Sequence, residues 1–524
     1  MNKQKNECRN GSFVVKCLSF VASLFKNSAV MKFVFSLPDR VAKVYADSFL
    51  YRCLSVNDVE NHSQASVFYK IVCFFSRVIK NIASFFVGNL ENTPKSGVTV
   101  KAARFLFSSS VLVKVVKPVT DFVFSPEGII AIICGAVFCI PHEMWNYVFG
   151  LAASVVMLLL AIVAAVCKKD KISVRPDRLW LSFMLFVMSS VFSTVFSMDR
   201  SDSIRVFAFF ATSFIMYAAV RIIASSKEGR HRMLLVMYVV SVGAAIYAVY
   251  QGFVGVEADP SLTDLSLNSD MPGRVFSTFG NPNNYAEFIV LFLPFSVVFA
   301  LSAKSVFGKL VLFAPLSVVI AALMQTYSRS GWIAFAVATI VFIVLYNKKL
   351  IPLLVLAAII AVPFLPATVM DRILTIGNMN DSSSSYRLII WQGCLDMLKD
   401  WWVSGVGLGP GAFSNVYPFY SYGISSVAPH SHMQFMEMLI ELGVFGFVSY
   451  MWFMFELIKR SCMGSKNPDK SKANVSIACA AAVTGIVLVG LFEYCWFYPR
   501  VMLAFFVAAA MGAQDNEKLK PEED

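Results

Sequence analysis

The chain from about residue 127 onward alternates long apolar runs with short polar connections. Each run is about 16 to 23 residues long, the length that a helix needs to cross the hydrocarbon core of a bilayer. Pro141 and His142 separate the first two runs, so these two could also form a re-entrant hairpin. The pattern predicts an all-α, polytopic membrane helix bundle of about twelve transmembrane helices. These runs begin near Gly128, Trp145, Trp180, Ser203, Met233, Tyr285, Leu310, Gly331, Leu350, His432, Ala473 and Val501.

The composition also indicates a membrane protein. Hydrophobic residues make up 57% of the chain and charged residues 15%, and the mean hydropathy of +0.66 is far above that of soluble globular proteins. The eleven cysteines are scattered singly, without a CxxC pair, and no histidines stand at the spacing of metal ligands. Neither a disulfide framework nor a zinc site is therefore expected.

Residues 1–125 differ from the rest because lysines and arginines recur within their short apolar runs. This segment holds 17 lysines and arginines against 7 aspartates and glutamates, a net charge of +10. It could form amphipathic helices on the anionic cytoplasmic leaflet, or it could be a poorly packed, partly disordered extension. We expect a basic cytoplasmic or interfacial extension at 1–125, a transmembrane domain at 126–512 and a cytoplasmic tail at 513–524.

The positions of the lysines and arginines predict the orientation. The formal net charge of +12 would also suit a nucleic-acid partner, but the positive residues lie in short connections and in the extension, which indicates topology signals and lipid contacts instead. The basic connections alternate with acidic or aromatic ones, so both termini are expected in the cytoplasm. The basic connections are 168–178, 227–232, 304–309, 348–349 and 459–472, and the others are 199–203, 254–284, 326–330, the long loop before residue 432, and 493–500.

The longest polar interruption runs from Asp371 to Gly443 and faces outward in this orientation. Its glycine, serine and aromatic residues, including four glycines between Gly405 and Gly411, allow it to fold locally. It contains Arg387 and two of the five histidines of the chain. We take residues 367–431 as an outer catalytic loop.

Three arginines, Arg274, Arg329 and Arg387, fall on the predicted outer side. Arg329 lies in a turn so short that its guanidinium must sit near the headgroup plane, where it either finds a partner or reaches lipid phosphate. Arg387 opens a segment of helical periodicity expected along the membrane surface, and its alternative role is a salt bridge to Asp381 or Asp396. Together, Arg329 and Arg387 offer planar, bidentate forks suited to a diphosphate.

Two histidines flank Ser431 where the long loop re-enters the membrane. A neutral imidazole is the usual side chain for taking a proton from a hydroxyl near neutral pH. On residue chemistry alone, each of His430 and His432 could be that base or a satisfied loop histidine. Glu437 or Glu441 could orient the imidazole, although pairing within the bundle suits their helix positions better.

Five motifs together resemble the O-antigen ligase and O-antigen polymerase superfamily, whose members are membrane glycosyltransferases that take glycan from a polyprenyl diphosphate carrier. They occur in the order of that family, with similar spacing, over roughly residues 270–450. The motifs are RVFSTFGNPNNYAEF at 274–288, TYSRSGW at 326–332, SYRLIIW at 385–391, GVGLGPGAF at 405–413 and HSHMQFMEMLIELGVFG at 430–446.

The resemblance implies a twelve-helix fold in which two arginines hold the diphosphate of the donor and a histidine activates the acceptor hydroxyl. Arg329 and Arg387 match the arginine positions, and Arg274 in the first motif is a further candidate for binding the diphosphate. His432 matches the catalytic histidine best. Met433 stands where the family usually has asparagine, so His430 remains a second candidate.

We therefore expect a metal-independent, inverting glycosyltransferase without a cofactor, multi-pass in the bacterial plasma membrane. It would move an oligo- or polysaccharide from undecaprenyl diphosphate to a hydroxyl of a glycan or lipid-linked acceptor on the outer side, and membrane lipids would be its other partners. A polysaccharide polymerase of the same superfamily is an alternative. A lipid-linked oligosaccharide transporter is more distant, because transporters place ionisable groups near the midplane.

Overall fold

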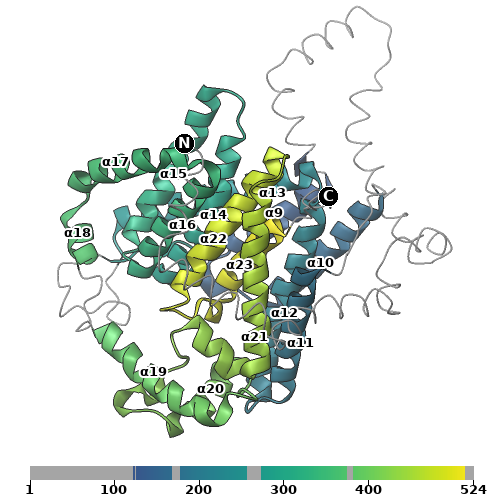
Figure 1. The fold of residues 1–524 in the computed structure, drawn as a ribbon, viewed down its shortest axis with the longest axis vertical. Coiled ribbons are helices and arrows are strands. Elements are labelled where there is room, and N and C mark those ends of the chain that lie inside the picture. Colours follow the sequence, from purple (N-terminus) through teal and green to yellow (C-terminus); the bar gives the residue numbers. More distant parts are fainter. Residues whose placement is uncertain (1–121, 124, 168–176, 257–272, 375–381, 514–524) are drawn as a thin grey trace, which may run out of the picture.

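The computed structural model describes residues 122–123, 125–167, 177–256, 273–374 and 382–513, and every element within these residues is a helix (Figure 1). The basic extension lies almost entirely outside the described residues, as does most of the predicted cytoplasmic tail. The proposed roles of these two segments stay predictions.

Each predicted apolar run coincides with one of the helices. Eight described segments are long and apolar enough to cross a membrane, with Arg329–Ala361 counted as one, while Pro126–Cys139, Tyr147–Ile162 and Pro499–Gly512 are shorter apolar helices. The all-α membrane fold is thus confirmed, and the number of twelve spans stays a prediction. The helices are α9 (Pro126–Cys139), α10 (Tyr147–Cys167), α11 (Arg178–Val195), α12 (Arg200–Ala224), α13 (Lys227–Val254), α14 (Pro282–Leu301), α15 (Val306–Gln325), α16 (Arg329–Asn347), α17 (Ile351–Ala361), α21 (Gln434–Gly464), α22 (Lys470–Val489) and α23 (Pro499–Gly512).

The polar connections supply side-chain caps to several of these helices. Asp177 accepts a hydrogen bond from the Trp180 N–H at 2.7 Å, and Ser328 accepts one from the Gly331 N–H at 3.3 Å. Such side chains satisfy backbone donors that the first helical turn leaves unpaired. These caps help to fix where α11 and α16 begin.

The centre of the bundle is formed by α14, α22 and α23, in which most side chains are buried. α22 packs against α14, α16 and α21, and α23 packs against α12. A side chain at Gly485 of α22 would come within 2.6 Å of the Val290 side chain, so the glycine permits the close approach of α14. In contrast, α17 has an apolar and exposed surface, which suits contact with lipid.

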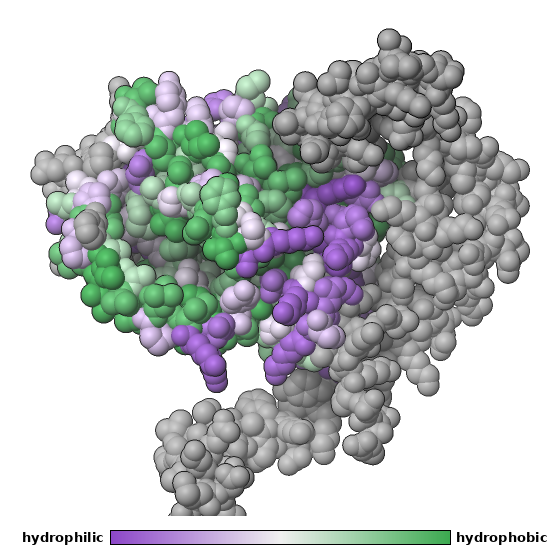
Figure 2. Space-filling model, turned by 90° about the horizontal axis from the view of Figure 1, so that it is seen from above, coloured by the Kyte–Doolittle hydropathy of each residue, from purple (hydrophilic) through white to green (hydrophobic). Residues whose placement is uncertain are grey.

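The connections sort into two ends of the bundle. At the basic end, ion pairs join different helices: Arg460 and Arg221 both meet Asp177, and Arg230 lies 3.7 Å from Asp469. Figure 2 looks onto this end, where hydrophilic side chains gather on one side of the face. The opposite end, called the site end below, carries the connections that were predicted to be acidic or aromatic.

The long polar segment folds into α18 (Ala367–Leu374), α19 (Ser382–Trp401), α20 (Pro410–Val416), η6 (Tyr417–Phe419) and η7 (Gly423–Val427). In Figure 1, α19 and α20 lie at the bottom and α18 lies at the left edge. The segment has a small core of its own, built around Ile390, Cys394, Met397, Phe413 and Tyr417. The helical periodicity predicted after Arg387 is confirmed by α19.

This segment docks onto a break in α21. Gly443 has non-helical backbone angles, with φ 67° and ψ −177°, so α21 is interrupted there. The interruption leaves the carbonyl groups of Ile440 and Glu441 available, and they accept the N–H groups of Val406 and Gly407 at 2.8 and 3.2 Å. The glycine-rich stretch is thereby bonded to the helix that follows the two histidines.

Candidate active site

Segments far apart in the sequence meet at the site end. The Val275 N–H donates to the Gln325 carbonyl at 3.2 Å, which joins the connection before α14 to the turn between α15 and α16. The Gln434 N–H donates to the Gly490 carbonyl at 2.8 Å, which joins the start of α21 to the connection between α22 and α23. The predicted arginines and histidines lie in or beside these joined segments.

The two histidines are held in a fixed mutual geometry. The His432 N–H donates to Nδ1 of His430 at 3.1 Å, and the two ring centroids are 4.1 Å apart. Between them, the Ser431 N–H donates to Oε2 of Glu437 at 2.6 Å, and its carbonyl accepts from Nε1 of Trp391 at 2.9 Å. The segment is therefore fastened on one side to α21 and on the other to α19.

Strained backbone gathers in the same place. Among the described residues, three that are not glycine have φ in the left-handed region: Ser277 at 53°, Tyr327 at 50° and His432 at 55°. All three lie in the segments that meet at the site end. Such a conformation costs about 1–3 kcal/mol in a residue with a side chain and is concentrated at functional sites.

The environments of the two histidines differ. His430 is buried, and burial together with the nearby His432 and Arg387 lowers its pKa to about 3, even though Glu493 acts in the opposite direction. His430 is therefore neutral near pH 7, and its Nδ1 is used by the His432 N–H. In contrast, 23% of the His432 side-chain surface is exposed, so its ring can meet a substrate.

Glu493, which the sequence did not single out, lies at the centre of the site. Its Oε1 accepts from Nη2 of Arg387 at 2.5 Å and from Nδ2 of Asn283 at 3.3 Å, and its Oε2 lies 3.9 Å from Nδ1 of His432. Burial raises the pKa of Glu493, but Arg387 and the two histidines act more strongly in the other direction, so that it lies at about 2. Glu493 is thus ionised. The only signal in the sequence that could have pointed to Glu493 was its position in EYCWFYPR, a connection predicted to lie on the outer side.

The two glutamates considered as partners of the imidazole have other contacts. Glu437 accepts the Ser431 N–H, and Glu441 accepts the Gly409 N–H and the Tyr494 hydroxyl, both at 2.9 Å. The suggestion that either orients a histidine ring is wrong, because Glu493 is the carboxylate beside the His432 imidazole. The alternative was that one of the two glutamates pairs within the bundle, and the contacts of Glu441 agree with it.

Arg274 is buried behind these groups. Its Nε donates to the Thr326 carbonyl at 2.8 Å, and its Nη2 donates to Oδ1 of Asn283 at 2.6 Å. Its pKa is lowered to about 9, mainly by burial and then by the charge of Arg372. Glu493 acts in the opposite direction, and Arg329 and Arg387 make smaller contributions to the decrease. Four arginines therefore share one electrostatic neighbourhood in the described part of the chain.

We call Arg274, Arg329, Arg372 and Arg387 the arginine cluster. Arg372, which lies on α18 and is buried, was missed by the sequence analysis because a lone arginine near a helix end looks like a solvent or lipid contact. The alternative role considered for Arg387, a salt bridge to Asp396, is wrong, because Asp396 pairs with Lys399 at 2.5 Å. The other partner considered, Asp381, lies outside the described residues.

The glycine-rich stretch serves docking and is no open cradle for an anion. As with Gly409, the Gly411 N–H is already bound to a carboxylate, Oδ2 of Asp202 at 2.8 Å. Gly407 has φ of 116°, and a Cβ there would come within 2.0 Å of Oγ of Ser197. The glycines therefore allow the loop to lie against α12 and α21.

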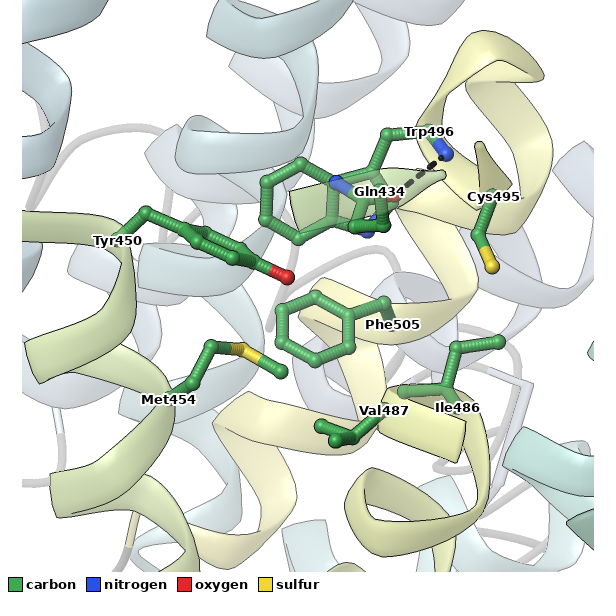
Figure 3. A pocket seen from close by; sticks show the side chains of 8 residues that line it. All are labelled: Gln434, Tyr450, Met454, Ile486, Val487, Cys495, Trp496 and Phe505. Atoms are coloured by element: carbon green, nitrogen blue, oxygen red, sulfur yellow. Dashed lines mark hydrogen bonds between the residues drawn. The ribbon is translucent and has the colours of Figure 1, made fainter. Parts of the chain in front are cut away.

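Gln434 fastens the connection that carries Glu493. Its N–H also donates to the Glu493 carbonyl at 3.1 Å, and its Oε1 accepts from the Trp496 N–H at 3.2 Å, as Figure 3 shows. The backbone of Glu493 is therefore bonded to Gln434, which follows His432 by two residues. A small, mainly apolar cavity lies beside this clamp, lined by Gln434, Tyr450, Met454, Ile486, Val487, Cys495, Trp496 and Phe505 (Figure 3).

Residues 314–451 match the family model described as O-antigen ligase. This match supports membership of the O-antigen ligase superfamily. The match includes Arg329, Arg372, Arg387 and both histidines, whereas Glu493 lies outside it. The chain is therefore a multi-pass membrane protein with a domain of the ligase- or polymerase-type glycosyltransferases. No curated protein matches the chain.

Proposed function

We propose that this ligase-superfamily protein transfers an oligo- or polysaccharide from undecaprenyl diphosphate to an acceptor hydroxyl. The arginine cluster would bind the diphosphate of the donor. His432 would take the proton of the acceptor hydroxyl, and His430 would hold the backbone of His432 in place.

The observation that carries this proposal is the arginine cluster beside His432. Guanidinium groups suit phosphate oxygens, because they are permanently charged and donate paired, planar hydrogen bonds. The Arg387 guanidinium and the His432 ring both contact Glu493, at 2.5 and 3.9 Å. The Arg387 guanidinium and the His432 imidazole thus lie on either side of one carboxylate. This proximity supports the proposal that a diphosphate site and a base act together in the transfer.

The proposed step is one displacement at the anomeric carbon of the donor sugar. The acceptor oxygen forms a bond to this carbon while the bond from the carbon to the diphosphate oxygen breaks, so the configuration is inverted. The diphosphate leaves with the bonding electron pair, and the hydroxyl proton passes to Nε2 of His432. The arginine cluster stabilises the charge that develops on the leaving group, a contribution that enzymes often draw from preorganised cations. These charges suffice in our proposal, which needs no metal ion.

The proposed orientation puts the site end outside the cell. Lysines and arginines are concentrated in the connections of the opposite end, which the positive-inside rule places in the cytoplasm. Undecaprenyl diphosphate glycans would then reach the arginine cluster from the outer leaflet of the bacterial plasma membrane.

A reconstituted reaction tests the function. Purified protein in lipid vesicles is given undecaprenyl-diphosphate-linked glycan together with a glycan or lipid-linked acceptor, and free undecaprenyl diphosphate and the joined product are measured. The proposal requires both products in equal amounts. Chain lengthening, with the donor glycan itself as acceptor, indicates the polymerase reaction.

The control is the same vesicle with the His432→Ala protein. This variant is expected to keep the donor intact. Movement of the intact donor across the bilayer without release of undecaprenyl diphosphate would instead identify a transporter, and the glycosyltransferase proposal would then be abandoned.

A further inference from the structure

We propose that Glu493 links donor binding to activation of the base: the diphosphate draws Arg387 away from Glu493, and the released carboxylate moves onto Nδ1 of His432. Glu493 is a positioning residue in this scheme, since it acts through His432. The inference rests on the proposed function, because it assumes that a diphosphate binds at the arginine cluster.

The starting geometry leaves the imidazole without a firm partner. Nδ1 of His432 is buried and has no hydrogen-bond partner among the described residues. The group facing it is Oε2 of Glu493, whose distance of 3.9 Å is longer than a hydrogen bond. A buried nitrogen in this state calls for a partner, and a shift of about 1 Å would bring Glu493 to hydrogen-bond distance.

The other oxygen of Glu493 explains why this shift has not occurred. Oε1 is held by Arg387 at 2.5 Å and by Asn283 at 3.3 Å. The contact with Arg387 is short and charge-assisted, and hydrogen bonds of this kind are stronger than neutral ones. While Arg387 occupies Glu493, the carboxylate is kept away from the imidazole.

A diphosphate competes with Glu493 for the same guanidinium. It carries more than one negative charge and accepts paired hydrogen bonds, so it suits Arg387 better than one carboxylate oxygen does. The neighbouring positive charges of Arg274, Arg329 and Arg372 favour the incoming anion further. Donor binding is therefore expected to break the contact between Arg387 and Glu493.

The surrounding bonds confine the resulting movement to a side chain. The Glu493 carbonyl is bound to the Gln434 N–H at 3.1 Å, so the backbone stays in place. Asn283 donates to Glu493 and accepts from Arg274, and it can keep one carboxylate oxygen oriented after Arg387 has left. Rotation of the Glu493 side chain is then enough to bring Oε2 to His432.

The consequence is an ordered reaction. A carboxylate that accepts the Nδ1–H of an imidazole fixes the tautomer in which Nε2 is the acceptor, and it stabilises the imidazolium that forms. His432 would therefore become an effective base only when the donor is bound. Donor should bind first and the acceptor hydroxyl second.

The first test is the Glu493→Gln variant, whose side chain has the same size and no charge. Binding of undecaprenyl diphosphate in lipid nanodiscs is expected to tighten about tenfold, because Arg387 is no longer held by a carboxylate. Turnover is expected to fall at least about tenfold, because His432 loses its partner. Tighter binding with slower turnover is a combination that damage to the fold does not produce. Weaker binding would overturn the proposal.

A second variant separates the contact with Arg387 from the general loss of a negative charge. In an Arg387→Ala background, Glu493→Gln is expected to leave the affinity for undecaprenyl diphosphate unchanged within about twofold. If Glu493→Gln tightens undecaprenyl diphosphate binding equally with and without Arg387, the Glu493 charge acts on the ligand by long-range electrostatics and not through Arg387. The coupling would then be rejected.

The state of the imidazole can be observed directly. In protein labelled with ¹⁵N-histidine, undecaprenyl diphosphate is expected to shift the Nδ1 signal of His432, assigned with a His432→Gln sample, in the native protein and not in Glu493→Gln. If undecaprenyl diphosphate binds to saturation and the His432 signal does not shift, the coupling through Glu493 is rejected, while the proposed diphosphate site at the arginine cluster is kept. Absence of binding would instead reject the proposed function, and the coupling with it.

Discussion

Glu493 and Arg387 are separated by 106 residues in the sequence, yet Oε1 of the carboxylate lies 2.5 Å from Nη2 of the guanidinium. The contact ties the connection between α22 and α23 to α19, and it places Arg387 beside His432. One carboxylate thereby links the group proposed to bind the donor to the group proposed to activate the acceptor.

Replacing Arg387 or Arg329 by lysine tests the diphosphate site. Lysine keeps a positive charge but lacks the planar, paired donors, so glycan transfer is expected to fall about 10- to 100-fold in each variant. Initial rates of undecaprenyl diphosphate release measure the effect. Arg221→Lys, at the basic end, is the matched control and should retain native rates. Native rates in both site variants would make these arginines lipid anchors.

A separate prediction concerns Arg372, the fourth arginine of the cluster. Arg372 is buried on α18, and its charge is the largest charge contribution to the pKa shift of Arg274. Arg372→Gln should weaken binding of undecaprenyl diphosphate about tenfold, because one charge of the cluster is lost. Binding in lipid nanodiscs measures the loss. Unchanged affinity in a normally inserted protein would remove Arg372 from the donor site.

Much of this fold could be predicted from the sequence, because membrane helices leave a strong signal. A run such as that of α22 must be long and apolar to cross the bilayer, and short capped connections mark its ends. The turn at Arg329 is predictable for the same reason: two long apolar runs leave few residues between them. The helix after Arg387 follows from its periodicity.

The assembly of the site could not be predicted in the same way. Glu493 stands in an aromatic connection with no local motif, and its role comes from a contact with a residue in another segment. Arg372 shows its importance only through burial near Arg274. The sequence identifies single side chains with suitable chemistry. Which of these side chains contact one another depends on how separate connections pack at one end of the bundle.

The orientation can be tested with engineered cysteines. Cys394 is buried in the small core of the site end, so a native thiol there is a poor reporter. Ser414→Cys on α20 and Lys466→Cys at the basic end are exposed positions. Cys139 is also exposed, so both engineered cysteines are placed in a background in which the native cysteines are serine. A membrane-impermeant thiol reagent should then label the cysteine at position 414 in intact cells and the cysteine at position 466 only after the membrane is opened. The reverse result would place the site in the cytoplasm.

The buried state of His430 predicts how stability depends on pH. Its pKa is lowered from 6.5 to about 3 in the folded protein, so below pH 6.5 the unfolded chain binds more protons than the folded one. The contribution of His430 to stability should therefore fall as the pH decreases from 6.5 toward 3. Glu493, with a pKa lowered from 4.5 to about 2, adds a loss of the same sign only below pH 4.5.

The measurement is the thermal denaturation temperature in detergent between pH 4.5 and 6.5. The charged and titratable groups facing His430 are His432, Glu493, Arg387 and the ring of Tyr494, which stay the same in a His430→Asn variant. Asparagine can still accept the His432 N–H and does not titrate, so this variant should show a flatter dependence. An unchanged slope would mean that another group is responsible.

The last prediction distinguishes the two histidines by function. His432 has its ring partly exposed beside Glu493, whereas His430 is buried, has a pKa of about 3 and already uses Nδ1 to accept the His432 N–H. A group with so low a pKa is a poor proton acceptor near neutral pH, so His432 should be the base. His432→Ala is expected to reduce transfer about 10²- to 10⁴-fold while undecaprenyl diphosphate still binds. His430→Asn keeps an acceptor for the His432 N–H and should retain most of the transfer activity. His430→Ala removes that acceptor, so its activity should lie between those of His430→Asn and His432→Ala. An active His432→Ala protein together with an inactive His430→Asn protein would move the base to His430, and native rates in both would exclude catalysis by either histidine.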